Sequence, residues 1–476
     1  MIQTNQESNS LKAIGRLIKP NKQSTKSSSL QVSTLKYKDG GEYRGEIKNG
    51  KRNGKGIMIY SNGEIYDGHW LNDLINGFGI YNYSNGDRYV GQFFKELRNG
   101  KGKFFFANGE IQDGEWKNDR LNGDGVMYFK NGDKYDGQWA NGIKSGFGVL
   151  NYTNGDSFEG YFKNNEKNGK GEYHWANGDY YIGEWKNNNE NGKGIKYYEN
   201  GDVYDGSWFD GQMSGYGVYN YTDGDRYEGF YLNDEKNGNG KWFTDNNTLV
   251  YVGEWRNDQR NGKGLNIYNN GDRYDGEWLD DEMSGIGSLN YSNGEKYEGS
   301  FLHGLRSGNG KQFSVNGTLL YDGEWKHDAA NGKGIQYFDT GDVYEGDWVN
   351  GIMSGFGIFN SSNGDRYEGA FSNGSAYGQG ILYFNNTDKY EGEFLNFEMS
   401  GRGVFYFNNP TEKTKGDRYE GEFKNNDITG VGVYFYNNGD KYEGRFVFGN
   451  RNGQGKFTAK DGKIKEGLWS NDVFVS

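Results

Sequence analysis

The stretch YNYSNGDRY, residues 81–89, decides the fold because close copies of it return along the chain. The copies are LNYTNGDSF from Leu150, YNYTDGDRY from Tyr219, LNYSNGEKY from Leu289 and FNSSNGDRY from Phe359. Successive copies start 69, 69, 70 and 70 residues apart. A fixed period of this kind predicts a repeat protein.

Each long interval contains three shorter units of about 23 residues. A unit reads Tyr-x-Gly-x-Trp, then Asn-Gly-x-Gly, then Asn-Gly-Asp before the next Tyr. There are 18 such units, and a truncated nineteenth begins at Lys465. Because the units follow one another without a break, they predict one array rather than several globular domains. The units open at Tyr43, Tyr66, Tyr89, Gln112, Tyr135, Phe158, Tyr181, Tyr204, Tyr227, Tyr251, Tyr274, Tyr297, Tyr321, Tyr344, Tyr367, Tyr390, Tyr419 and Tyr442.

The composition combines low hydropathy with many aromatic residues. A mean hydropathy of -1.02 favours disorder, but 39 Tyr, 30 Phe and 12 Trp are too many for a solvated coil. The absence of cysteine excludes disulfides, thiolate zinc sites and a cysteine nucleophile. Because no secretory signal and no run of roughly 18 apolar residues is present, we expect a soluble, cytoplasmic protein.

Two turn signals in each unit predict two short strands, which together form a β-hairpin. In the first strand of one unit, Tyr66, Gly68 and Trp70 share a face, because side chains alternate across a strand. A glycine within a strand leaves room for a neighbouring ring to lie over the backbone. The pattern therefore predicts a structural ladder of rings and glycines along one face. Its members include Tyr66, Gly68, Trp70, Tyr135, Gly137, Trp139, Tyr204, Gly206, Trp208, Tyr274, Gly276, Trp278, Tyr344, Gly346 and Trp348.

Proline usage agrees with a continuous sheet. Pro20 precedes the array, and Pro410 lies in an insertion that lengthens one unit to 29 residues. Proline cannot occupy a central strand, and none lies between Tyr43 and Asn409, so this part of the array is free of such interruptions. We predict an all-β fold, an elongated antiparallel β-meander or solenoid-like ribbon of about 18 tandem 23-residue β-hairpins. At about 4.8 Å between strands, it would extend on the order of 170 Å.

The unit resembles the MORN (membrane occupation and recognition nexus) repeat. The resemblance rests on Tyr-x-Gly-Glu-Trp, as in residues 251–255 and 321–325, followed by Asn-Gly-Lys-Gly, as in 261–264 and 331–334. It implies one β-hairpin per repeat, stacked into an elongated scaffold. Similar proteins include junctophilins, radial spoke head components, cytoskeletal scaffolds of protists and plant phosphoinositide kinases. Because this chain shows no junctophilin-like membrane anchor, kinase domain or methyltransferase domain, we expect only the scaffold role to carry over.

No motif in the array predicts catalysis or a cofactor. The Gly-x-Gly pairs do not continue into a P-loop or a dinucleotide-binding motif, so they are interpreted as structural. The histidines His69, His174, His303 and His327 fall at different positions of their units, which argues against a metal site or a catalytic triad. Recurring acidic residues, as in Asp67, Asp136, Glu159 and Asp205, are interpreted as a solvated charge ladder, because nothing would enclose a substrate there. We expect no enzyme activity, no cofactor, no metal and no nucleic-acid partner.

Residues 1–36 differ from the array, which we place at residues 37–476. They carry six basic residues against Glu7 alone, a net charge of +5, so the repeats carry -17 of the total of -12. One interpretation is a disordered, Ser/Thr-rich tail that aids solubility. The other is a short amphipathic segment that binds a partner or a membrane surface. The candidate binding residues for the second interpretation are Lys12, Arg16, Lys19, Lys22 and Lys26.

These observations favour a non-enzymatic structural scaffold that binds protein partners along an elongated β-ribbon, in a cytoskeletal or ciliary assembly. The alternative is a peripheral adaptor at anionic, phosphoinositide-containing membranes, which would use the basic N-terminal tail for weak contact at the cytoplasmic face. A regulatory subunit that holds a lipid-modifying enzyme is not distinguished from the scaffold by sequence. The aromatic face itself is expected to be mainly structural, with any remaining rings lining a groove for a peptide or helix. The partner, the organelle and the oligomeric state are left open.

The period of 69 or 70 residues has two interpretations. Residues 213–215, 283–285 and 353–355 all read Met-Ser-Gly, so units three apart resemble each other more than neighbours do. Duplication of three-unit blocks in the gene would produce this pattern. Alternatively, like surface patches recur every six strands, about 29 Å apart, and bind a repeating partner.

Overall fold

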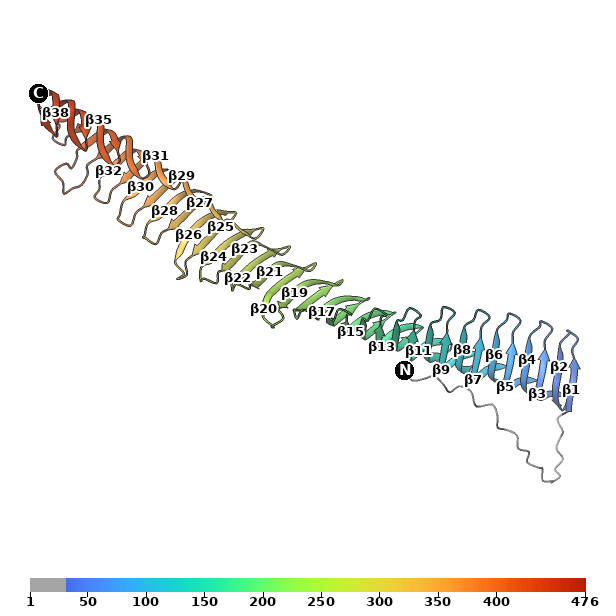
Figure 1. Cartoon of the computed structure of the whole chain (residues 1–476). Coiled ribbons are helices and arrows are strands. Elements are labelled where there is room, and N and C mark those ends of the chain that lie inside the picture. The colour runs from blue at the N-terminus through green and yellow to red at the C-terminus, as the bar shows by residue number, and fades with distance from the viewer. Residues whose placement is uncertain (1–30) are drawn as a thin grey trace, which may run out of the picture. The chain divides into compact units, whose positions relative to one another are not determined.

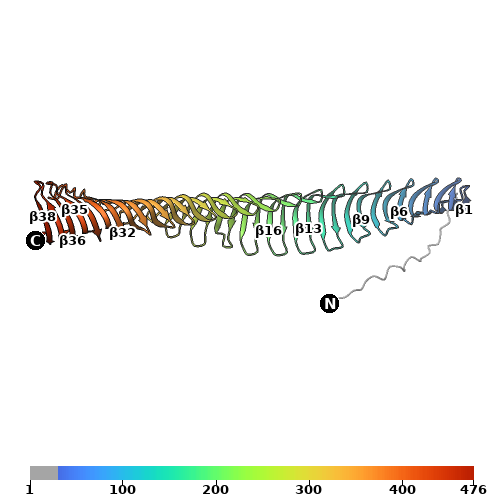
Figure 2. The same cartoon turned by 90° about the horizontal axis from the view of Figure 1, so that it is seen from above.

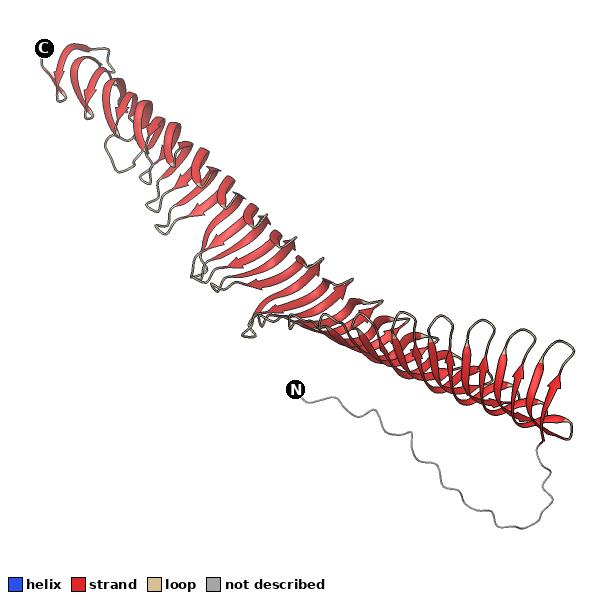
Figure 3. Ribbon diagram, turned by 45° about the vertical axis from the view of Figure 1, so that its right-hand side comes forward, coloured by secondary structure: helices blue, strands red, loops and turns tan. Residues whose placement is uncertain are grey.

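The computed structural model describes residues 31–476, in which all regular elements are β-strands (Figures 1 and 3). Within these residues, no helix is long and apolar enough to cross a membrane. The chain divides into two compact units, one ending at Asn189 and the other comprising Glu190–Ser476. Each is described separately below.

The strands of the first unit are joined to their neighbours in the chain by short turns. They are β1 (Gln31–Lys36), β2 (Glu42–Lys48), β3 (Lys51–Ile59), β4 (Ile65–Leu71), β5 (Leu74–Asn82), β6 (Arg88–Phe94), β7 (Leu97–Phe105), β8 (Ile111–Lys117), β9 (Arg120–Tyr128), β10 (Lys134–Ala140), β11 (Ile143–Asn151), β12 (Ser157–Lys163), β13 (Glu166–His174) and β14 (Tyr180–Lys186).

The strands of the second unit continue the same alternation of seven-residue and nine-residue strands, with few exceptions. They are β15 (Asn189–Tyr197), β16 (Val203–Phe209), β17 (Gln212–Asn220), β18 (Arg226–Leu232), β19 (Glu235–Phe243), β20 (Leu249–Arg256), β21 (Gln259–Ile267), β22 (Arg273–Leu279), β23 (Glu282–Asn290), β24 (Lys296–Leu302), β25 (Leu305–Phe313), β26 (Leu319–Lys326), β27 (Ala329–Tyr337), β28 (Val343–Val349), β29 (Ile352–Asn360), β30 (Arg366–Ser372), β31 (Ser375–Tyr383), β32 (Lys389–Leu395), β33 (Glu398–Tyr406), β34 (Arg418–Lys424), β35 (Asp427–Phe435), β36 (Lys441–Val447), β37 (Asn450–Thr458), β38 (Ile464–Ser470) and β39 (Val473–Phe474).

Within each unit, every strand pairs antiparallel with the strands before and after it, as in β4 with β5 and β5 with β6. Figure 2 shows the strands of each unit from above, lying side by side in chain order. The predicted all-β meander of hairpins is thereby confirmed. The insertion with Pro410 forms the loop between β33 and β34, outside any strand.

One difference from the sequence-based boundaries lies at the start of the array. Residues 31–36, assigned by sequence to the tail, form β1 and pair with β2 from Val32↔Glu46 to Lys36↔Glu42. These residues lack the repeat motif but include Val32 and Thr34, whose β-branched side chains suit a strand. Strand β1 covers the edge of the first repeat, which would otherwise expose unpaired backbone groups.

The hairpin of the second repeat shows why the motif has its spacing. The two-residue turn uses Asn72 and Asp73, with φ of 51° and 73°, as a type I′ turn requires. Beyond it, Gly68 pairs with Gly79, and between Gly79 and the turn β5 bulges relative to β4. Gly77, at φ of 102°, lies in this bulge. The Asn-Gly-x-Gly motif therefore places one glycine in the bulge and the next opposite the glycine of β4.

The Asn-Gly-Asp motif holds successive long loops together. In the first unit, the Asp133 carboxylate accepts a hydrogen bond from the backbone N–H of Thr153 at 2.9 Å. In the second unit, Asp202 accepts the equivalent bond from Thr222 at 2.8 Å. Each bond spans 20 residues, about one repeat, so the motif residue is needed for stacking as well as for its own turn.

Candidate interaction surface

One face of each unit, here called the aromatic face, is built from rings lying on glycine. The Tyr66 ring covers the backbone of Gly68 and Gly79, where an added Cβ would meet ring atoms at 2.5 and 2.4 Å. The Tyr66 hydroxyl donates a hydrogen bond to the carbonyl of His69 at 3.0 Å. The ring is fully buried, because the flat glycine pair lets it approach the backbone.

Tryptophan and phenylalanine join these tyrosines into a continuous series. Trp70 packs edge to face on Tyr66 and Tyr43, with ring centroids 5.2 and 5.5 Å apart. Phe93 bridges Tyr66 to Tyr89 in the same way, at 5.4 and 5.0 Å. Such edge-to-face pairs add about 0.5–1.5 kcal/mol each beyond burial. The rings therefore supply the core that a single-layer sheet otherwise lacks.

The structure places the fifteen ladder residues named from sequence on this face. Their five tyrosines are 0% exposed and their five tryptophans are 3% to 7% exposed. Beneath each tyrosine, a Cβ added at the ladder glycine would meet its hydroxyl at between 2.3 and 2.7 Å. Since their rings are covered, these residues are unavailable to a partner in the folded chain.

In two repeats the tyrosine that opens the motif is replaced, and another apolar side chain fills the space over the glycines. Phe158 replaces tyrosine and still lies on its glycine pair, so the hydroxyl is dispensable for the packing. At Gln112 the ring is missing, and Leu121, 1% exposed, packs against Gly114 instead. The space over the glycines is thus filled in both cases.

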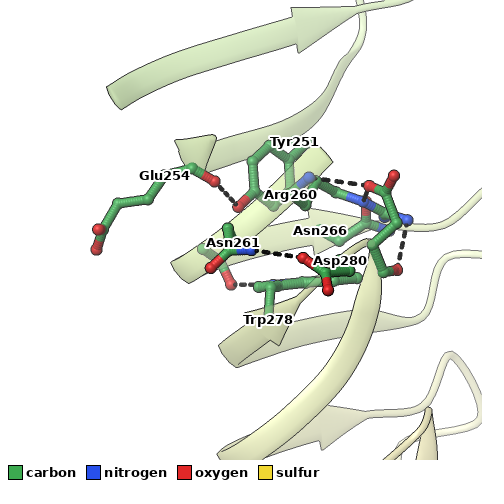
Figure 4. A network of polar contacts seen from close by, with 9 residues as sticks. Tyr251, Glu254, Arg260, Asn261, Asn266, Trp278 and Asp280 are labelled. Carbon is green, nitrogen blue, oxygen red and sulfur yellow. Dashed lines mark hydrogen bonds and ion pairs between the residues drawn. The ribbon is translucent and has the colours of Figure 1, made fainter. Parts of the chain in front are cut away.

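Polar groups on the aromatic face are largely satisfied within the chain (Figure 4). The Arg260 guanidinium lies 4.2 Å from the Trp278 ring centroid and donates to the Asp281 carboxylate at 2.9 Å. It also donates to the side-chain oxygen of Asn266 at 3.0 Å. The Trp278 indole donates to the carbonyl of Gly264 at 3.0 Å. This network joins neighbouring repeats and leaves little polar surface for a ligand.

A hollow on the aromatic face of the first unit is the exception. Its volume is about 730 Å³, and Phe129, Lys144, Tyr152 and Phe162 line it. Lys144 takes the place that Arg260 has in the second unit, but its turn partner is Asn165 rather than an aspartate. Burial lowers the pKa of Lys144, which lies 5.2 Å from the Phe162 ring centroid. In this part of the first unit, rings of the aromatic face line an open hollow; a groove that binds a peptide or helix stays a prediction.

The opposite face, here called the outer face, carries the exposed apolar residues. In Asn-Gly-x-Gly, or in the variants that begin with Ser, Thr or Tyr, residue x points outward, and in twelve units it is polar or charged. In the other six, here called the apolar units, it is a large apolar residue that is between 42% and 63% exposed. These six residues are Phe78, Phe147, Tyr216, Ile286, Phe356 and Val431.

The apolar units recur every third repeat, which is the long period of the sequence. Two of their exposed side chains also contact a ring on the next strand, Phe147 with Tyr161 and Tyr216 with Phe230, each at 5.7 Å between centroids. Sequence analysis identified the period and gave recurring patches as one of its two interpretations, but it did not locate such patches at residue x. The signal was present, because x changes from polar to apolar with this period.

The remaining candidates named from sequence are the histidines, the recurring acids and the basic residues of the tail. Among residues 31–476, no group of three or more His, Asp and Glu side chains is arranged to hold a metal ion. His69 contacts the carbonyl of Phe78 at 2.8 Å, and His303 contacts the Glu282 carboxylate at 2.9 Å. The basic tail residues Lys12, Arg16, Lys19, Lys22 and Lys26 lie outside the described part of the chain.

Comparison with known families gives one extensive match. The MORN repeat profile matches 18 segments, in agreement with the unit count from sequence. The matched residues are 43–65, 66–88, 89–111, 113–134, 135–157, 158–180, 181–203, 204–226, 227–248, 251–273, 274–296, 297–319, 321–343, 344–366, 367–389, 390–409, 419–441 and 442–464. Among curated proteins there is no significant match.

Similar solved structures share only limited geometry with this chain. The TCP domain of SAS-4 from Drosophila melanogaster, in complex with a proline-rich motif of Ana2, is 13% identical, with a TM-score of 0.23. The alignment covers 33% of this chain and 85% of that domain. The TCP10 domain of CPAP from Danio rerio is 12% identical over 52% of this chain and 99% of the domain, with a TM-score of 0.18. At these scores the likeness carries no argument about function.

Proposed function

The chain belongs to the MORN-repeat family, and on that premise we propose that it is a non-enzymatic scaffold that binds protein partners along its outer face. The rings of the aromatic face are committed to the core, so binding falls to the other side of the sheet. The proposed setting is a cytoskeletal or ciliary assembly in the cytoplasm, as in the scaffolds that the repeat resembles.

The observation that carries this proposal is the regular exposure of the six apolar residues. Twelve units have a polar or charged residue at position x and fold in the same way. A large apolar side chain exposed at this position therefore gives no benefit to folding. Contiguous apolar patches on a soluble protein typically mark interaction sites. The pairs Phe147 with Tyr161 and Tyr216 with Phe230 form such patches at equivalent positions in the two units. A partner with several contact points would gain affinity from their recurrence.

We expect replacement of these side chains by serine to reduce partner binding by at least about tenfold, because several contacts are lost together. The measurement is proximity labelling in the native cell, with the labelling enzyme fused to the full chain. The test variant combines Phe147→Ser, Tyr216→Ser, Ile286→Ser and Phe356→Ser. The control variant combines Phe94→Ser, Phe209→Ser, Leu302→Ser and Leu395→Ser, which are similarly exposed at strand ends. Equal losses in both variants would contradict the proposal.

The membrane adaptor is the competing function, and the +5 charge of residues 1–36 is what favours it. In the labelling experiment, this function predicts membrane proteins that persist in both serine variants. It also predicts that replacing the five basic tail residues by glutamine removes them, because the charge that attracts anionic lipid is gone. The scaffold proposal predicts that the tail variant retains its partners.

A further inference from the structure

We propose that the outer face of the apolar units binds an extended, basic protein segment, which places a lysine or arginine between two carboxylates of neighbouring strands. An apolar side chain of the same segment would pack on the exposed residue x. This inference rests on the proposed function, since it names the chemistry of the partner. It is carried by the register of the strands and by a comparison between repeats of this chain.

The register brings two carboxylates to either side of one aliphatic residue. Val218 in β17 lies directly opposite Asp205 of β16 and Glu228 of β18. Residues directly opposite across strands lie on the same face, so all three side chains point outward. The two carboxylates are separated by two strand spacings, about 10 Å.

The same arrangement recurs in five of the six apolar units. Only the first differs, because Val90 replaces the second acidic residue beside Ile80. The other central residues with their flanking carboxylates are Val149 with Asp136 and Glu159, Val218 with Asp205 and Glu228, Ser288 with Asp275 and Glu298, Ile358 with Glu345 and Glu368, and Val433 with Glu420 and Glu443.

The repeat that follows an apolar unit shows what such a carboxylate pair accepts. Lys311 in β25 lies opposite Glu298 of β24 and Asp322 of β26. Its ammonium group is 2.9 Å from the Asp322 carboxylate, and this hydrogen bond raises the pKa of Lys311. Lys456 lies between Glu443 and Glu466 in the same way. The chain thus supplies its own cation at this position in these repeats.

The apolar units lack that cation. At the position of Lys311 they have valine, isoleucine or serine, and none of these can neutralise the flanking acids. Among the described residues, Asp205, Asp275 and Glu345 form no ion pair with a lysine or arginine of the chain. The second acid of the same pairs, Glu228, Glu298 or Glu368, is instead held by the arginine or lysine two residues before it in its own strand. Within the described part of the chain, folding therefore leaves one carboxylate of each of these three pairs without an ion-pair partner, next to a central position that holds no cation and an exposed apolar residue.

Two of these sites form open hollows on the outer face. The site at Ile286 encloses about 430 Å³ and is lined by Lys263, Asp275, Glu277 and Glu298, hence by three carboxylates and one ammonium group. The hollow at Val431 has a volume of about 600 Å³ and is lined by Glu391, Glu420 and Glu443, whose carboxylates pair with Lys389, Arg418 and Lys441. In both hollows, paired glycines contribute backbone rather than side chains to the lining. The two hollows share their place on the repeat, and the unpaired carboxylate of Asp275 lies in the hollow at Ile286.

Charge and spacing select an extended basic peptide. The net negative charge of the residues that line the hollow at Ile286 disfavours anionic lipids and nucleic acids. The exposed side chain of Ile286 favours a ligand that is partly apolar. In an extended segment, side chains two residues apart lie on one side and about 7 Å apart, the same separation as Ile286 and Ser288. A segment with an apolar residue two positions from a lysine matches both features.

The recurrence within the second unit adds a condition on the partner. The sites at Tyr216, Ile286, Phe356 and Val431 lie six strands apart, on β17, β23, β29 and β35. Six strand spacings correspond to about 29 Å, which an extended peptide covers in about nine residues. A partner with several such segments would engage successive sites at once.

The test uses the full chain and a fluorescent synthetic peptide with two Val-Gly-Lys segments, whose lysines are nine residues apart. Binding is measured by fluorescence anisotropy at physiological salt. The test variant is Asp205→Asn, Asp275→Asn and Glu345→Gln. The control variant, Asp113→Asn, Asp322→Asn and Glu466→Gln, removes equal charge beside Lys103, Lys311 and Lys456. We expect at least about tenfold weaker binding for the test variant and less than about twofold for the control, because each control carboxylate is already ion-paired with a lysine of the chain.

A second variant supplies the missing cation within the chain. Val218→Lys, Ser288→Lys and Ile358→Lys reproduce the arrangement of Lys311, which the strand already accommodates. We expect this variant to keep its β-sheet circular dichroism and to lose peptide binding. Equal weakening in the test and control variants, unchanged binding in the lysine variant, or no binding by the native chain would each overturn the inference. If partners in the cell still depend on the exposed apolar residues, the proposed scaffold function survives that result.

Discussion

Replacing Gly217 by valine is expected to lower the free energy of unfolding around β16–β18 by about 3 kcal/mol, although valine normally favours a strand. The Gly217 Cβ would lie 2.4 Å from the Tyr204 ring, which has no room to move because it is fully buried. Denaturant unfolding followed by hydrogen exchange of the β16 and β17 amides measures the loss.

The matched control for this substitution is Asn239→Val. Asn239 is the exposed residue between two glycines of β19 on the outer face, so valine there tests strand preference without the ring. Its effect is expected to stay within about 0.5 kcal/mol. If both variants lost the same stability, the close packing of Tyr204 on glycine would not be what stabilises the hairpin.

Raising the pH above about 10 is expected to unfold the array, because tyrosine in an unfolded chain ionises near that pH. Burial raises the pKa of Tyr43 and of Tyr367 to about 12, and it also raises the pKa of Tyr204 and Tyr274. The folded chain therefore holds protons that the unfolded chain releases.

The sign of the pH effect follows from that proton difference. Stability from these tyrosines is complete below pH 10 and is lost as the pH rises towards 12 and beyond. Each such tyrosine lowers the free energy of unfolding by about 1.4 kcal/mol per pH unit in this range. Phenolate absorbance and circular dichroism, followed together during an alkaline titration, should change in one steep step. Gradual ionisation near pH 10 with an unchanged sheet would contradict the buried ladder.

The repeat and its hairpin could be predicted from sequence because their signals are local. Tyr66, Gly68 and Trp70 lie within five residues, and strand alternation alone puts them on one face. The contact between Asp202 and Thr222 could not be predicted in this way, since it joins two loops 20 residues apart. It depends on how one repeat stacks on the next, which the pattern of a single repeat does not specify.

The candidate site was predictable only in part for a related reason. The period of three repeats and the recurring acids were visible, and Asp205 and Glu228 could be placed on one face. That Val218 lies between them depends on register, which the bulge between β16 and β17 helps to set. Without that register, the acids were interpreted as a uniform charge ladder. The structure instead distinguishes acids that are ion-paired with a lysine on the neighbouring strand, such as Asp322 with Lys311, from acids such as Asp205, which have no ion-pair partner among residues 31–476.

The most direct test of the division between a structural face and a binding face is hydroxyl-radical footprinting of the full chain, purified and in the native cell. The account predicts that Tyr204 and Tyr344, fully buried, stay unreactive in both samples. Tyr216 and Phe356, which are exposed, should be oxidised readily in the purified chain and protected in the cell, where a partner covers them. Oxidation of Tyr204 at the rate of Tyr216, or equal oxidation of Tyr216 and Phe356 in both samples, would contradict the account.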